Sequence, residues 1–226
     1  MAMQLFTRKE VAYQKIKEGI LNREWQPGTK IVERSLSQTF NMSRIPIREA
    51  LSRLEKEGLV VQVPNWGTYI RKADEKEVME MYEVREALEG VAVRLAAARA
   101  TGEDLDELIQ NVEAMKKTAF KKGEENFHAF EEADNKFHVT LVKTSHNSKL
   151  IELASLCHLR AEVIPGVVSE ESVKKERRRL LEEHRQIVEY LSAKKALAAE
   201  KLVRRHIFGA KRKAERYFRE KEKERE

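Results

Sequence analysis

From about Asp74 to the end of this 226-residue chain, apolar side chains recur every three or four residues with little interruption. That spacing is the period of an α-helix that buries one face. Three of the four prolines, and the only clear strand pattern, come before this point. The sequence therefore predicts a mainly α protein with a mixed amino-terminal part and an all-helical remainder.

Helical periodicity and residues that start or stop helices place the expected elements along the chain. Helices are predicted near residues 9–22, 33–40, 44–57, 75–99, 102–121, 124–145, 148–163, 171–192 and 195–223. Two β-prone runs, 59–63 and 68–71, flank a turn and predict a hairpin. With no Gly/Ser-rich or Pro-rich linker near residue 73, we expect two directly joined domains, 1–73 and 74–226.

The net charge of +6 is unevenly distributed. Residues 1–73 hold 13 Lys and Arg against 7 Asp and Glu, whereas residues 74–226 hold 31 of each. This asymmetry is expected if the first domain meets a polyanion, although a merely well-solvated basic domain would share it. The chain lacks a membrane-spanning apolar run and a signal-peptide core, and Cys157 is its only cysteine. These features predict no membrane contact and a cytoplasmic location.

The first domain has the layout of a helix-turn-helix. The short helix near 33–40 and a two-residue connection precede a helix that Ser43 can cap and whose first turn tolerates Pro46. Arg44 and Arg48 lie at the amino-terminal end of this helix, which enters the major groove in such motifs. The basic hairpin that follows predicts a wing. A purely structural module with a hairpin is the alternative.

Four polar side chains interrupt the apolar stripes of the later helices. Asp134 and His138 lie one turn apart on one stripe, and His184 and His206 lie on two others. Taken singly, each would be read as a hydrogen-bonded core residue. Together they are hard to bury, because an ionised group inside a core costs several kcal/mol unless it is paired or metal-bound. The set therefore predicts a metal site inside a helical bundle.

Three imidazoles and one carboxylate suit several divalent ions. We expect one ion per subunit, zinc or nickel first, with manganese and iron(II) as alternatives. A closed tetrahedral site would be purely structural. An octahedral site would leave two positions for water or for the carboxylate of a ligand, and we favour this second form.

The stretch IKEGILNREWQPGTKIVERSLSQTFNMSRIPIREALSRLEKEGLVVQVPNWGTYI resembles the winged-helix domain of the GntR family of bacterial transcription regulators, over about residues 10–72. The PG turn, the SRIPIREAL helix and the EGLV…G wing carry the resemblance. Gly67 is implied to reach the minor groove from the wing tip, beside Trp66, where a small or polar residue is more usual. This tryptophan could pack on the sugar backbone or on its own domain. The remaining implied DNA contacts are Arg34, Ser43, Arg44, Ile45, Pro46 and Arg48.

The later helices resemble the all-helical FCD effector domain of the FadR-type subgroup, over about residues 77–218. The motifs are MYEVREALEGVAVRLAA, DNKFH, EEHRQIVEYL and VRRHI. One branch of that domain holds a metal with one Asp or Asn and three His, and all four positions are filled here. Small carboxylates are recurrent effectors in this subgroup, so Arg85 and Arg160 are candidates to pair an effector carboxylate. A surface ion pair is the alternative for both.

These features predict a ligand-responsive transcription regulator, expected to be a repressor. A homodimer is expected because one recognition helix reads few base pairs, whereas two read a pseudo-palindromic double-stranded DNA operator. The expected effector is a small organic acid. The alternatives are a metal-dependent hydrolase or dioxygenase, a regulator that senses the metal itself, and non-specific DNA packaging. We expect no enzyme, since HExxH and nucleophile-elbow motifs are absent from the sequence.

Overall fold

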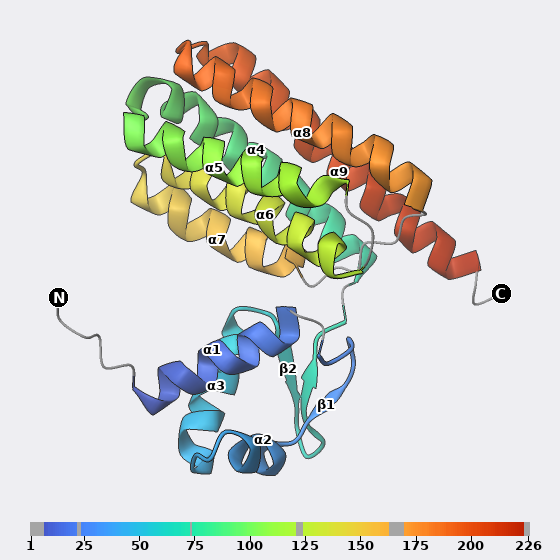
Figure 1. Cartoon of the computed structure of the whole chain (residues 1–226). Coiled ribbons are helices and arrows are strands. Elements are labelled where there is room, and N and C mark those ends of the chain that lie inside the picture. Colours follow the sequence, from blue (N-terminus) through green and yellow to red (C-terminus); the bar gives the residue numbers. More distant parts are fainter. Residues whose placement is uncertain (1–6, 22–23, 73, 121–123, 163–169, 224–226) are drawn as a thin grey trace. The chain divides into compact units, whose positions relative to one another are not determined.

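A computed structural model describes the chain except residues 1–6, 22–23, 73, 121–123, 163–169 and 224–226 (Figure 1). The side chains of residues 124–128, 158–162, 170–175 and 221 also lie outside the described part. The chain folds as two compact units, and the sequence passes from one to the other at Asp74–Glu75. The mainly α architecture predicted from the sequence is confirmed.

The first unit is a winged helix-turn-helix. Its elements are α1 (Arg8–Leu21), β1 (Lys30–Ile31), α2 (Glu33–Thr39), α3 (Arg44–Lys56), β2 (Val60–Val63) and β3 (Gly67–Ile70). The predicted hairpin β2–β3 is present, and β1 pairs antiparallel with β3 to give the strand order β1-β3-β2. The sequence did not predict β1, because two residues are too few for an alternating pattern.

The inner faces of α1 and α3 form the core of this unit. Ile16 of α1 and Ile47 and Leu54 of α3 are fully buried. Burying such a side chain contributes about 1.5–3 kcal/mol, so this contact is the main support of the helix-turn-helix. After α3 the chain reverses at Gly58, whose φ of 78° lies in the left-handed region that glycine tolerates. The reversal leads directly into the wing.

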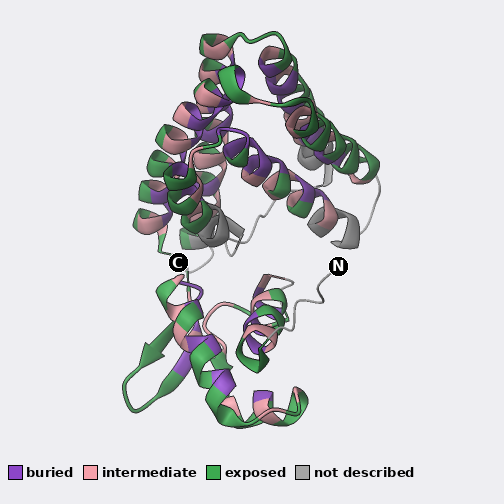
Figure 2. Ribbon diagram, turned by 90° about the vertical axis from the view of Figure 1, so that its left-hand side faces the viewer, coloured by how far each residue is buried: buried purple, intermediate pink, exposed green. Residues whose placement is uncertain are grey.

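The second unit consists of helices in its described part. They are α4 (Glu75–Arg99), α5 (Gly102–Ala119), α6 (Glu124–Lys143), α7 (Ser148–Glu162), α8 (Glu170–Ser192) and α9 (Ala196–Lys223). Helix α4 packs along α9, α5 along α6, and α8 against both α5 and α9. Each helix turns a buried face inward and an exposed face to solvent, as Figure 2 shows. Among the described residues, no helix has the length and apolar character that a bilayer crossing requires.

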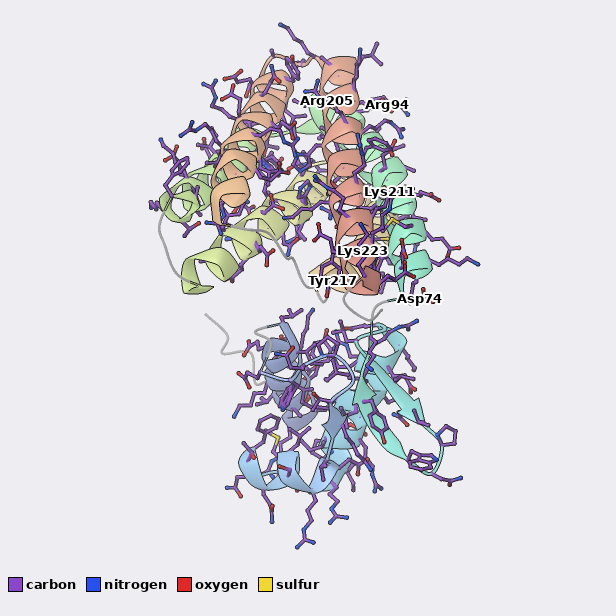
Figure 3. All side chains as sticks on the ribbon, turned by 90° about the vertical axis from the view of Figure 1, so that its right-hand side faces the viewer. Asp74, Arg94, Arg205, Lys211, Tyr217 and Lys223 are labelled. Carbon is purple, nitrogen blue, oxygen red and sulfur yellow. The ribbon has the colours of Figure 1, made fainter. Side chains whose placement is uncertain are left out.

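Hydrocarbon packing holds these helices together. Phe137, Ile187 and Val203, from α6, α8 and α9, are fully buried in one cluster. Ion pairs run along the outer side of α4 and α9, where Figure 3 marks Arg94 and Lys211. Lys211 Nζ lies 2.7 Å from a carboxylate oxygen of Glu83, and Arg94 makes a longer pair of 3.7 Å with α9. Exposed pairs contribute only about 0–1 kcal/mol each, so apolar burial dominates.

Candidate metal centre and DNA-binding surface

Three helices bring Asp134, His138, His184 and His206 to one point inside the second unit. Helix α6 carries the first two, one turn apart, α8 carries His184 and α9 carries His206. One candidate ligand atom from each residue lies within 4.8 Å of all the others. The three imidazoles are buried, and the Asp134 side chain is 24% exposed. The four residues selected from the sequence therefore form one cluster that could hold a metal ion.

The spacing of the ligand atoms suits a shared ion. His138 Nε2 lies 3.1 Å from His206 Nε2 and 3.4 Å from His184 Nε2. Asp134 Oδ1 lies 3.4 Å from His184 Nε2, and Asp134 Oδ2 lies 3.9 Å from His138 Nε2. Ligand atoms about 2.1 Å from one ion are about 3.0 Å apart at right angles and about 3.4 Å apart in a tetrahedron. The separations of 3.1 and 3.4 Å lie in this range, and the 3.9 Å separation between Asp134 and His138 is somewhat longer.

The second nitrogen of each imidazole faces a hydrogen-bond acceptor. His138 Nδ1 lies 2.7 Å from Glu89 Oε2, and His206 Nδ1 lies 2.8 Å from Glu183 Oε2. His184 Nδ1 lies 2.6 Å from a backbone carbonyl one turn earlier in α8. A neutral imidazole that donates from Nδ1 has a bare lone pair on Nε2. Three such lone pairs therefore converge beside a carboxylate, which is a donor set suited to a cation.

The charge state of the cluster also fits a divalent ion. Asp134 Oδ1 is buried and accepts no hydrogen bond from the part of the chain that the structure describes. Burial acts to raise the pKa of Asp134, but the adjoining His184 and His138 act against burial, and the pKa of this carboxyl lies below its usual value. Burial lowers the pKa of His184 to about 4. Burial, together with the charge of Arg85, holds the pKa of His138 well below its usual value. Neutral imidazoles can bind a metal without first losing a proton.

Arg85, the predicted effector-binding residue, is buried in α4. Its Nε donates to Glu89 Oε1 at 2.5 Å, and its Nη1 and Nη2 make no hydrogen bond to any other described residue. The positive charge of Arg85 acts on both Asp134 and His138, so it belongs to the same cluster. The side chain of Arg160, the other predicted effector-binding residue, lies outside the described residues.

Glu89 and Glu183 were not singled out in the sequence. A signal for Glu89 was available, because Arg85 and Glu89 form an i,i+4 pair on the buried face of α4. Glu183 directly precedes His184 and gave no separate signal.

In the first unit, most residues implied to touch DNA lie at the surface. Arg34, Ser43, Arg44, Arg48 and Gly67 are exposed, as is Ile45, which is 69% exposed. Pro46 is buried instead, so it offers little surface to a DNA groove.

Two of these residues have local partners different from those expected. Ser43 occupies the position before α3, but its hydroxyl makes no capping hydrogen bond, so the predicted side-chain cap is wrong. Its backbone nevertheless has the extended conformation typical of that position. Arg48 Nε lies 2.7 Å from Glu33 Oε2, in an exposed ion pair.

The wing presents an aromatic side chain at its tip. The turn closes where the Trp66 N–H donates to the Val63 carbonyl at 3.0 Å. Asn65 and Gly67 have φ of 65° and 107°, in the region that favours Asn and Gly in turns. Trp66 itself is 69% exposed, so the alternative that it packs into its own unit is wrong. An exposed tryptophan at the tip of the hairpin is available to another molecule.

Comparisons with known proteins agree with these features. Residues 8–70 match the family described as bacterial regulatory proteins, gntR family, and residues 80–209 match the FCD domain. The uncharacterized HTH-type transcriptional regulator YdhC of Bacillus subtilis (strain 168) is 34% identical over 195 residues, which are 86% of this chain and 85% of that protein. The HTH-type transcriptional repressor RspR of Escherichia coli (strain K12) is 30% identical over 131 residues, 58% of this chain and 56% of that protein.

A likeness to solved structures extends over nearly the whole chain. Escherichia coli McbR/YncC has 18% sequence identity and a TM-score of 0.80, covering 95% of this chain and 100% of that one. At this identity the likeness shows a shared fold and nothing finer.

Proposed function

The chain belongs to the GntR family of bacterial regulatory proteins and is a DNA-binding transcriptional regulator, and we propose that its FCD domain binds one divalent metal ion and, through it, a small organic acid. The observation that carries this proposal is the convergence of three Nε2 lone pairs on a carboxylate whose Oδ1 has no hydrogen-bond partner among the described residues. Zinc or nickel suits these donors first, with manganese or iron(II) as alternatives. When bound, the ion supplies positive charge and open coordination positions.

The proposed DNA contacts centre on the amino-terminal end of α3. Arg44 and Arg48 carry the guanidinium groups that pair guanine in the major groove, and the exposed Ile45 can touch a thymine methyl. Arg48 would exchange Glu33 for DNA, whereas Pro46, buried in the first turn, would shape the helix end without contacting a base. The wing would enter the adjacent minor groove with Gly67 and Trp66.

The proposed regulator acts as a homodimer. Two recognition helices related by a twofold axis would read a pseudo-palindromic operator. We assign DNA binding to residues 1–73, and effector binding and dimerisation to residues 74–226. An effector would act through different affinities for two domain arrangements. RspR is named a repressor. We propose likewise that this regulator releases its operator when the effector binds.

The charge of the centre supports an anionic effector. With neutral imidazoles, the carboxylates of Asp134, Glu89, Glu183 and Glu176 exceed the guanidinium groups of Arg85 and Arg179 by two negative charges. A divalent ion would cancel this excess and so remove the repulsion of an anion, and the Nη groups of Arg85 are available to a carboxylate. Acetate and malonate titrated calorimetrically should bind the metal-loaded protein and not the chelator-treated protein. Equal binding to both forms would contradict the proposed effector site.

Metal content tests the metal centre directly. Purified wild-type protein dialysed against zinc or nickel should retain about one ion per chain by elemental analysis, and His184→Ala should retain less than about a tenth of that. His146→Ala is the matched control, because His146 is half-exposed and bonds Asp104, away from the cluster. Retention of metal by His184→Ala at the wild-type level, or no uptake by wild type, would refute the metal site.

A second candidate keeps the same site but makes the metal itself the signal. It is favoured by the fact that the four ligands come from three helices, which one ion alone could tie together. Operator affinity measured against metal concentration, without an organic acid, separates the two candidates. The named relatives and matching families are regulators and not enzymes, so we propose no catalytic role.

A further inference from the structure

Two glutamates occupy matching positions behind the candidate metal centre. Glu89 of α4 and Glu183 of α8 each accept a hydrogen bond from the Nδ1 of a histidine ligand. Each glutamate is also bound by an arginine one turn earlier on its own helix. Arg85 Nε lies 2.5 Å from Glu89 Oε1, and Arg179 Nη1 lies 2.7 Å from Glu183 Oε1. Two Arg–Glu–His chains therefore approach the centre from different helices.

We propose that Glu89 and Glu183 are positioning residues that hold His138 and His206 in the tautomer with a bare Nε2, and so strengthen metal binding. The inference rests on the proposed metal site. A ring that donates its Nδ1–H to a carboxylate keeps its orientation and becomes a more basic ligand at Nε2. The arginines in turn hold each carboxylate in place. His184 differs, because its Nδ1 faces a backbone carbonyl.

The two glutamates differ in what their removal would leave behind. Glu89 is 0% exposed, and it is the carboxylate that pairs the buried Arg85, so a neutral residue there would strand a buried guanidinium. The Glu183 side chain is 11% exposed, and Arg179 also binds Glu176 at 2.7 Å. Arg179 therefore stays paired when Glu183 is replaced, so variants of Glu183 are expected to keep the fold.

The test compares metal affinity in variants of neighbouring residues on α8. Glu183→Ala removes the acceptor for His206, Glu183→Gln keeps an acceptor oxygen without the charge, and Glu182→Ala is the matched control. Glu182 is 62% exposed and binds Arg185 at 2.8 Å. The probes are zinc(II) and cobalt(II) alone, in competition with a chromophoric chelator.

We expect Glu183→Ala to weaken zinc binding by about 10–100-fold, the range for lost partners of this kind. Glu183→Gln should recover part of the loss, and Glu182→Ala should stay within about twofold of wild type. The ¹⁵N chemical shifts of the His206 ring should show the Nδ1–H tautomer in wild type and a mixture in Glu183→Ala. Urea unfolding of the chelator-treated proteins should show similar stability for all four, which separates positioning from a loss of fold.

Glu89→Gln is the second variant. If its chelator-treated form remains folded by circular dichroism, its zinc affinity should fall at least as far as that of Glu183→Gln, because Glu89 is the more buried carboxylate.

Two results overturn the proposal in distinguishable ways. If wild type binds zinc and Glu183→Ala binds it equally well, or no more weakly than Glu182→Ala, the positioning role fails and the metal site stands. If wild type takes up no metal, the metal site fails and the positioning role fails with it.

Discussion

The metal-free helical unit should lose stability in mild acid, because the ring of His184 is buried in its neutral form. Its side chain is 0% exposed, and its ring packs edge-on against Phe137 with 4.4 Å between the ring centroids. Burial lowers its pKa from 6.5 to about 4. Between these two values the unfolded chain carries a proton on this ring that the folded chain does not. The free energy of unfolding must therefore fall as the pH falls.

The size of the effect follows from that shift. At about pH 5 the unfolded imidazole is almost fully protonated and the folded one only about a tenth protonated, which by linkage removes about 2 kcal/mol relative to pH 7.5. Below about pH 4 both states are protonated, and the loss levels off near 3 kcal/mol. A loss of this size is a large part of the stability of an ordinary domain.

Urea unfolding of chelator-treated protein at about pH 7.5 and pH 5 measures this loss. Far-ultraviolet circular dichroism follows mainly the helical unit, whereas Trp25 and Trp66 both lie in the first unit and report it separately by fluorescence. The comparison variant is His184→Gln, whose amide can still donate to the carbonyl in α8 and does not titrate. It should lose about 2 kcal/mol less than wild type between the two pH values.

The comparison of two variants removes the acid effects that both share. Carboxylates and histidines that lie away from the cluster titrate alike in wild type and in His184→Gln, so their contributions cancel. The remaining difference reports the titration of His184 together with the cluster residues that it contacts. His146→Gln, a change at a half-exposed ring, should keep the wild-type loss. Equal acid losses in wild type and His184→Gln would show that this ring is not held neutral by burial, and the reasoning would be refuted.

Three further predictions concern other parts of the molecule. Arg44→Ala should weaken binding to a duplex selected from a random library by about 1–3 kcal/mol in fluorescence anisotropy, and unchanged affinity would remove Arg44 from base reading. In a Trp25→Phe background, adding that duplex should change the emission of Trp66, and Trp66→Ala should weaken binding; an unchanged emission would mean that the wing tip does not touch DNA. Phe137→Ala should lower the free energy of unfolding of the helical unit by about 3–5 kcal/mol in urea, and a loss below about 1 kcal/mol would contradict its place in the core.

The residues that form the candidate metal centre could be selected from the sequence because the later helices have regular apolar stripes. A polar residue at a stripe position must face the core, whichever helices pack there, so Asp134, His138, His184 and His206 could be identified without knowing the fold. The same periodicity explains why the predicted helices match those observed to within a few residues. Periodicity depends on local geometry alone, which the sequence contains.

Features that depend on contacts between distant segments could not be predicted in this way. Strand β1 exists only because β3, which comes much later in the chain, lies beside it and pairs Tyr69 with Lys30. Glu183 is polar and next to a ligand, but only the packing of α8 against α9 brings it to His206. The exposure of Trp66 likewise follows from the turn conformation of the folded hairpin. Each of these features depends on how one element packs or pairs with another. The apolar pattern of a single helix or strand carries no information about such contacts.

The construction of the centre gives it a direct effect on the helices around it. Ionisable side chains from α4, α6, α8 and α9 occupy one layer of the helical unit. Apolar side chains in the same place would stabilise the fold more, so this layer contributes little stability without a cation. An ion that binds the folded form stabilises it by an amount that grows with its concentration relative to Kd, about 2.7 kcal/mol at a hundredfold excess. An ion in the cluster would join three of these helices, and the chain Arg85–Glu89–His138 would extend the link to α4, the helix that directly follows the DNA-binding unit in the sequence. A carboxylate that changed the coordination would have to move side chains on several of these helices at once. That is the physical requirement for a ligand in the second unit to alter the behaviour of the first.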